Sequence, residues 1–218
     1  HLGFRTLDYL GHTLSQGTLS PERSKVDQLR NAVRPTTKTE VRSFLGLARY
    51  YRRYVPNFNA IAGPLSDLTR KRAPSKVIWT DACEQAYLTL KDRLTSDAVV
   101  RLPDLFKDFV LRTDACDTGL GAVLLQEHDG TLFPVVYGSR KLSAAEKNYS
   151  VSERECLGIV FGISRFERYL YGRKFLLETN HQPHAGEIVK WTLDALVAVL
   201  TAVSDADQIC ERNGKRRH

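Results

Sequence analysis

Hydrophobic and polar positions in the first part of the chain predict a pair of strands followed by a helix. Residues 9–14 alternate as a β-strand does, and Ser15-Gln16-Gly17 has the composition of a turn, which together predict a short hairpin. Ser20 then has the position of a helix N-cap and Pro21 that of the first helical residue. We therefore expect a helix that begins at Ser20 and is ended by Arg34-Pro35.

The next helix has stronger local signals. Thr37 and Glu40 have the spacing of a capping box, in which each side chain accepts a hydrogen bond from the backbone of the other residue. The apolar residues that follow share one helical face: Val41, Phe44, Leu45, Ala48 and Tyr51. A loop rich in Arg and Pro at residues 70–74 separates this helix from an amphipathic one expected at residues 83–94.

The pattern changes to that of a sheet in the second half. Three strands are expected in succession, joined by short turns, at residues 108–114, 122–126 and 132–137. Such a succession forms an antiparallel meander. A long helix follows, with Ser150 or Ser152 as its cap and Tyr171-Gly172 at its end. A strand at residues 175–179 and a helix starting near Trp191 complete the order β-β-β-α-β-α.

These elements predict an α+β fold with two parts. Leu102-Pro103-Asp104 is typical of a linker, so we place a domain boundary near residue 105. Residues 1–105 are then a largely helical region, and residues 106–205 a mixed sheet with flanking helices. Residues 206–218 form a basic tail.

Charge is distributed unevenly between the two parts. The chain has a formal net charge of +7; residues 1–105 hold 17 basic and 10 acidic side chains, whereas residues 106–218 hold 15 of each. A basic half favours a polyanionic partner such as nucleic acid, although mild basicity is common in globular proteins. The four cysteines lack the spacing of a zinc site, and no apolar run reaches the roughly 18 residues that a membrane span needs. We expect an intracellular protein, cytoplasmic or nuclear.

The helix that begins near Thr37 carries Arg42, Gly46, Arg49 and Arg53 opposite its apolar face, with Arg52 beside them. This stripe has two interpretations. It is either a solvated surface, which the sequence alone favours, or a face that follows a phosphate backbone and lets it approach closely at the glycine.

Three residues at the ends of predicted elements are candidates for chemistry: Asp114, Glu155 and Asn180. Carboxylates that converge from adjacent elements can bind a divalent cation. Local alternatives exist for both carboxylates, since Asp114 could begin a turn with Asp117, and Glu155 could complete a capping box with Ser152.

Several unusual motifs occur in one order along the chain. They are residues 44–54 (Phe-Leu-Gly-Leu-Ala-Arg-Tyr-Tyr-Arg-Arg-Tyr), Pro64-Leu65, 79–83 (Trp-Thr-Asp-Ala-Cys), 113–116 (Thr-Asp-Ala-Cys), 119–124 (Gly-Leu-Gly-Ala-Val-Leu), 149–155 (Tyr-Ser-Val-Ser-Glu-Arg-Glu) and His181-Gln182-Pro183. With this order and spacing, residues 1–184 resemble the gypsy-type LTR-retrotransposon Pol polyprotein. The first three motifs are similar to the thumb and connection of its reverse transcriptase, and the others to the ribonuclease H-like domain that follows.

The resemblance implies a ribonuclease H fold that cleaves the RNA strand of an RNA/DNA hybrid with two Mg²⁺ ions, Mn²⁺ being a possible substitute. Asp114 and Glu155 match two of the catalytic carboxylates and would be metal ligands. The third carboxylate of the family stands in a Thr-Asp-His motif, where this chain has Thr179-Asn180-His181. The sequence after residue 184 also departs from the family, and a final aspartate has no clear counterpart there.

The loss of one carboxylate weakens the predicted metal site. Asn180 offers a neutral carbonyl oxygen where two divalent ions would need negative charge. We expect a rate loss of about a hundredfold or more, because one misplaced electrostatic group costs on the order of 3 kcal/mol.

The sequence therefore predicts a retroelement-derived protein that binds RNA/DNA hybrid or other duplex nucleic acid, with weak or absent hydrolysis. The alternatives are an active Mg²⁺-dependent hybrid ribonuclease and a non-catalytic, host-recruited interaction scaffold. The remainder of a Pol polyprotein, including the polymerase aspartates, would lie upstream of His1, and no membrane partner is expected.

Overall fold

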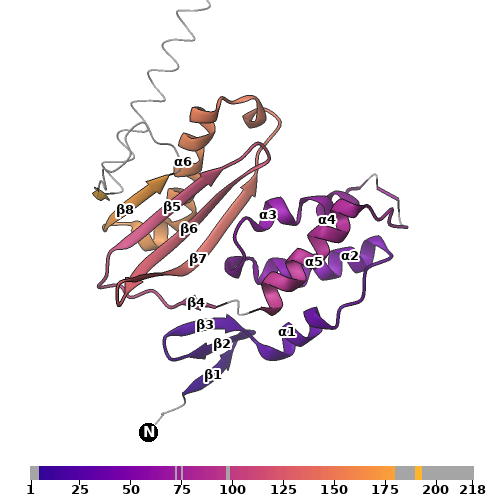
Figure 1. The fold of residues 1–218 in the computed structure, drawn as a ribbon, viewed down its shortest axis with the longest axis horizontal. Helices are drawn as coiled ribbons and strands as arrows, with labels where there is room; N and C mark the ends of the chain where they lie inside the picture. Colours follow the sequence, from indigo (N-terminus) through magenta and orange to yellow (C-terminus); the bar gives the residue numbers. More distant parts are fainter. Residues whose placement is uncertain (1–4, 72, 75, 97–98, 180–189, 193–218) are drawn as a thin grey trace, which may run out of the picture.

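The computed structural model describes residues 5–71, 73–74, 76–96, 99–179 and 190–192. In this part of the chain, a small sheet and a group of helices lie beside a larger sheet that carries one long helix on a face (Figure 1). The expected α+β fold is confirmed.

The small sheet is an antiparallel meander to which a later segment adds an edge. Its strands, in the order β1-β2-β3-β4, are Thr6–Tyr9, His12–Ser15, Thr18–Pro21 and Val100–Arg101. The turn expected after residue 14 is confirmed, with positive φ at Gln16 and Gly17. The single strand expected at residues 9–14 is wrong, because Leu10 and Gly11 also have positive φ and turn the chain between β1 and β2.

Helices fill the remainder of the first part. They are α1 (Arg23–Arg30), α2 (Lys38–Tyr50), the short 3₁₀ helix η1 (Arg52–Tyr54), α3 (Phe58–Ile61), α4 (Gly63–Leu68) and α5 (Asp81–Thr95). The helix start predicted at Ser20 is wrong, because Ser20 and Pro21 pair with β2, and α1 begins only after Glu22. Tertiary pairing has overridden the local capping signal there.

The second predicted helix agrees with the structure in detail. The Thr37 side chain accepts a hydrogen bond from the Glu40 backbone N–H, and the Glu40 carboxylate accepts one from the Thr37 backbone N–H, which completes the capping box. All five residues of the predicted apolar face are buried: Val41, Phe44, Leu45, Ala48 and Tyr51.

The larger sheet contains the predicted meander. In the order β7-β6-β5-β8-β9, its strands are Thr131–Lys141, Gly119–His128, Phe109–Ala115, Lys174–Thr179 and Lys190–Thr192. Strand β8 is parallel to β5, and α6 (Val151–Leu170) connects the meander to it after the short 3₁₀ helix η2 (Glu146–Asn148).

Two predictions for this part of the chain are decided by the structure. Ser150, rather than Ser152, is the N-cap of α6. The helix start predicted near Trp191 is wrong, because Trp191 lies in strand β9 and pairs with Phe175 of β8. The rest of that predicted helix lies outside the described residues, as does the basic tail.

Each part has its own hydrophobic core. Buried side chains from Leu19 to Val100 form one cluster, and those from Phe109 to Phe175 form the other. The boundary predicted near residue 105 falls between them, although the division into independent domains stays a prediction. No helix of the described residues combines the length and apolar character of a membrane span.

The two parts meet along β6 and β7. Asn57, with φ 51° at the start of α3, lies so close to β6 that a Cβ placed on Gly121 would come 2.1 Å from its Oδ1. The Asn59 backbone N–H donates to Ser139 Oγ at 3.0 Å, and Lys141 Nζ lies 3.6 Å from the Asp67 carboxylate. A side chain at position 121 would therefore force the Asn57 side chain out of this contact.

We predict that Gly121→Ala lowers the free energy of unfolding by about 1–3 kcal/mol, because the added methyl group overlaps Asn57. Denaturant-induced unfolding measures the loss. Adding Asn57→Gly, which keeps the left-handed backbone accessible, should recover most of it. Gly46→Ala in α2 is the control, because a Cβ there meets nothing within 4 Å and should be neutral or slightly stabilising. Equal stability of Gly121→Ala and the unmodified chain would contradict the proposed contact.

Candidate functional site

Asp114 lies near the carboxyl end of β5, in the middle of the larger sheet. It pairs with Gly121 of β6, and its side chain is exposed. The alternative in which Asp114 merely begins a turn is wrong, because the turn comes after Ala115. On the other side of β5, Thr113 pairs with Thr179, the last residue of β8. Asn180 follows in sequence but lies outside the described residues.

Glu155 lies on the face of α6 that packs on β5. Gly158 and Gly162 follow it at one and two helical turns, and both lie against β5. A Cβ on Gly162 would come 2.9 Å from the Thr113 methyl group, and one on Gly158 would come 3.9 Å from the Asp114 carbonyl oxygen. The helix therefore holds Glu155, whose exposed fraction is only 8%, near the carboxyl end of β5.

Helix capping does not account for Glu155. The capping box of α6 forms between Ser150 and Glu153, so the alternative that pairs Glu155 with Ser152 is wrong. Burial of a carboxylate is costly and is found where the charge has a partner. Glu155 is therefore a buried carboxylate whose position is not explained by capping the start of α6.

These residues supply part of a cation site. Carboxylate oxygens suit hard divalent cations, so Asp114 and Glu155 are chemically suited to hold Mg²⁺. Among the residues that the structure describes, no group of three His, Cys, Asp or Glu side chains gathers as a metal site. The described carboxylates therefore fit a cation only together with further ligands, such as Asn180 or a substrate phosphate.

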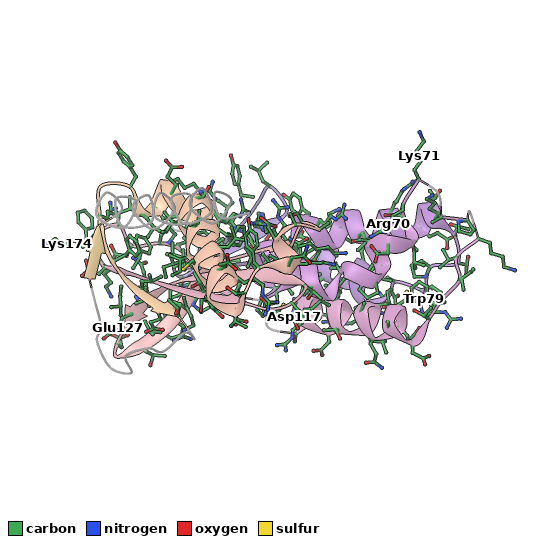
Figure 2. The ribbon with its side chains drawn as sticks, turned by 90° about the horizontal axis from the view of Figure 1, so that it is seen from above. Arg70, Lys71, Trp79, Asp117, Glu127 and Lys174 are labelled. Carbon is green, nitrogen blue, oxygen red and sulfur yellow. The ribbon has the colours of Figure 1, made fainter. Side chains whose placement is uncertain are left out.

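An ion pair beside the carboxylates was not predicted from the sequence. Arg154, next to Glu155, donates to the carboxylate of Asp117 in the turn between β5 and β6. Figure 2 shows Asp117 near the middle of the molecule, between Lys174 at one end and Arg70 at the other. The pair joins the turn after β5 to the first turns of α6 and so restrains both elements that carry the candidate ligands.

The connection that leads into α6 is held by a second ion pair. Arg140 donates through Nη1 and Nη2 to the two carboxylate oxygens of Glu146, at 2.8 and 2.9 Å. The Ser143 backbone N–H also donates to Glu146, at 2.7 Å. The hydrogen bonds from Arg140 and Ser143 lower the pKa of Glu146 to about 2.

The predicted basic stripe divides into two parts in the structure. Arg42 donates to the carbonyl oxygen of Thr69, the residue after α4, at 3.2 Å. Arg49 donates to Ser66 Oγ in α4 at 3.4 Å, so both side chains extend from α2 toward α4. Gly46 is exposed and has open space where a Cβ would lie. Arg52 and Arg53 belong to η1 rather than to α2.

Arg53 lies near an aromatic cluster that the sequence analysis missed. His12 stacks on Tyr50 with ring centroids 5.4 Å apart, and its Nδ1 lies 2.8 Å from Tyr54 Oη. Burial lowers the pKa of His12, and the charge of Arg53 lowers it further. Burial also raises the pKa of Tyr51 to about 12. The spacing of the tyrosines could have suggested the cluster, but the pairing with His12 depends on the turn at Gly11.

Comparisons with known proteins agree with this arrangement. Residues 79–177 match the family described as the RNase H-like domain found in reverse transcriptase. The chain is 39% identical over 178 residues to the retrovirus-related Pol polyprotein from transposon 297 of Drosophila melanogaster, covering 81% of this chain and 16% of the relative. It is 36% identical over 191 residues to that from transposon gypsy of the same species, covering 82% and 18%.

The chain belongs to the retrotransposon Pol family. The predicted gypsy-type resemblance is confirmed, although the chain spans less than a fifth of the length of these relatives. A solved structure of the foamy viral protease-reverse transcriptase in complex with RNA/DNA hybrid matches at a TM-score of 0.71 and 18% identity, over 92% of this chain and 28% of that one. At that identity the match supports the fold of this Pol segment.

We predict that Glu146→Gln lowers the free energy of unfolding by about 1–2 kcal/mol at neutral pH, because hydrogen bonds from Arg140 and Ser143 to a charged acceptor are lost. The folded-state pKa lies below the ordinary value of 4.5, so this stabilisation is present above that pH and is lost as the pH falls toward 2. Denaturant unfolding at pH values between about 7 and 3 measures both effects.

The matched control is Glu127→Gln, because Glu127 is exposed and forms no ion pair among the described residues. It should change stability little at any pH. A Glu146→Gln effect that stays constant as the pH falls would contradict the charge-based explanation.

Proposed function

We propose that this Pol segment binds RNA/DNA hybrid or a related duplex through its basic part, and that its hydrolysis of the RNA strand is weak or lost. The observation that carries the proposal is the placement of Glu155 near the Asp114 end of β5, with Asn180 directly after the parallel strand β8. The similar foamy viral reverse transcriptase was solved in complex with RNA/DNA hybrid, which supports this substrate class.

The residues have separate roles in this proposal. Asp114 and Glu155 would hold Mg²⁺, or Mn²⁺ in its place, and Asn180 would contribute at most a neutral oxygen. When bound, such ions activate a water molecule and stabilise the leaving oxygen in phosphodiester hydrolysis. Arg154, by pairing with Asp117, would keep the first turns of α6 and the turn after β5 in place as the substrate binds.

The basic part would supply most of the affinity. Arg42 and Arg49 each make one described hydrogen bond within the protein, and a guanidinium has five donors, so both retain donors for phosphate oxygens. The exposed Gly46 between them would let the sugar-phosphate backbone come close to α2.

We predict that Asn180→Asp raises the rate of RNA cleavage by about a hundredfold or more, because it restores a negative charge beside the metal ligands. Single-turnover cleavage of a labelled RNA/DNA hybrid, with Mg²⁺ and with Mn²⁺, measures the change. Asp114→Asn in the Asn180→Asp background is the control and should abolish the gain.

The same experiment separates the alternative functions. High activity of the unmodified chain would show an active ribonuclease and overturn the proposed loss of hydrolysis. Absence of cleavage by both the chain and Asn180→Asp would show that the site is incomplete for a further reason. Absence of hybrid binding even at low salt would leave only an interaction scaffold.

We predict that hybrid binding weakens linearly with the logarithm of salt concentration, with a slope of about −0.9 for each neutralised phosphate. Arg42→Ala and Arg49→Ala should each reduce the size of this slope by about 1, if each arginine contacts a separate phosphate. Lys174→Ala is the control, because Lys174 lies at the opposite end of the molecule from the loop after α4 (Figure 2). Unchanged slopes for both arginine variants would exclude α2 from the interface.

A further inference from the structure

A small polar pocket lies where the two parts of the chain meet. It has a volume of about 210 Å³ and is lined by Arg52, Tyr137, Gly138, Ser139 and Arg165. Arg52 comes from η1 in the first part, whereas Arg165 comes from α6 in the second. One pocket is therefore lined by two guanidinium groups, and the residues that carry them, 52 and 165, are 113 positions apart in sequence.

The backbone of β7 makes room for Arg165. A Cβ placed on Gly138 would come 2.9 Å from Arg165 Cγ and 3.2 Å from Phe166 Cζ. Any side chain at position 138 would therefore displace the stem of Arg165 from its place over β7. The glycine keeps Arg165 beside β7, where it faces the same pocket as Arg52.

The two guanidinium groups of this pocket have no carboxylate partner in the part of the chain that the structure describes. Among the described residues, neither Arg52 nor Arg165 forms an ion pair or a side-chain hydrogen bond. Burial lowers the pKa of Arg165, and the nearby charges of Arg52, Arg168 and Arg53 lower it further. An arginine nevertheless remains protonated in proteins, so the repulsion persists until an anion neutralises it.

We propose that this pocket binds one phosphate group, which Arg52 and Arg165 hold together. Planar guanidinium groups match the oxygens of a phosphate, and the pocket is smaller than those that take drug-sized ligands. Ser139 Oγ accepts a hydrogen bond from the Asn59 N–H, so its own proton remains available to donate to a phosphate oxygen. The bound anion would join η1 to α6 and thereby fix the two parts of the chain relative to each other.

The phosphate group has two possible sources, a nucleic-acid backbone or a free ion. Ten residues separate Glu155 from Arg165 on α6, so the pocket lies about 15 Å along the helix from the candidate carboxylates. A duplex carries one negative charge per roughly 1.7 Å of its axis, so one that crosses the carboxylates has phosphates at this distance. In that case the inference rests on the proposed function, whereas a free ion would bind independently of it.

The first experiment uses inorganic phosphate alone and so does not depend on hybrid binding. Thermal unfolding is followed with increasing phosphate, against chloride at equal ionic strength, for the unmodified chain, Arg52→Ala/Arg165→Ala and Lys174→Ala. We expect phosphate to raise the Tm of the unmodified chain and of Lys174→Ala in a concentration-dependent way, and to have no such effect on the double variant. If the double variant fails to fold, Arg165→Lys replaces it, since it keeps the charge but loses the planar fork.

The second experiment measures the salt dependence of hybrid binding for Arg52→Ala, Arg165→Ala and the double variant. Because both arginines contact one phosphate, the double variant should lose about one unit of slope, about 0.9, rather than about two. A loss of about two units would show separate phosphates and overturn the shared pocket. A loss of one unit would identify a backbone phosphate as the occupant.

The two experiments together give a decision in every case. A phosphate effect on Tm without a change of slope would support the pocket with a free ion as its occupant. If neither measurement separates the double variant from Lys174→Ala, the pocket does not bind phosphate and the inference is wrong. If the unmodified chain binds no hybrid, the proposed function fails, and the inorganic phosphate experiment alone decides the pocket.

Discussion

The close approach of the helical part to the larger sheet is the contact on which the rest of the structure depends. Gly121 permits it by leaving room for Asn57 above β6, and within the second part Gly138 leaves room for Arg165 of α6 beside β7. Ser139, which pairs with Gly121 and follows Gly138 in β7, is tied to α3 through Asn59. An added methyl group at either glycine would displace the side chain that lies against it, so both glycines help to set how these elements pack.

The same use of small residues positions the candidate chemistry. Gly158 and Gly162 let α6 lie close to β5, and this approach holds Glu155 near the strand end that carries Asp114. The ion pair of Arg154 with Asp117 restrains the turn between β5 and β6, and that of Arg140 with Glu146 restrains the connection that leads into α6. Backbone packing places the carboxylates, and charged side chains keep the flanking loops in position.

The arginines of the first part do not act as one uniform surface. Arg49 donates to Ser66 in α4 and Arg42 to Thr69, the residue after α4, whereas Arg52 lines a pocket together with Arg165 of the second part. In a segment of the retrotransposon Pol family, this division would separate the proposed general affinity for phosphate backbones from the proposed phosphate pocket at the junction. The pocket uses charge from both parts, so its occupation depends on how they are arranged.

The sequence by itself determined most elements and the candidate ligands. The capping box and apolar face of α2 and the meander depend on residues close together in the chain, so their local patterns were sufficient. Tertiary structure decided what depends on distant partners. Ser20 joined β3 instead of capping a helix because β2 pairs with it, and Trp191 joined β9 because β8 pairs with it. Arg165 came to line one pocket with Arg52 only through the arrangement of the two parts. Such contacts leave no periodic signal in the sequence, because the residues that form them are far apart along the chain.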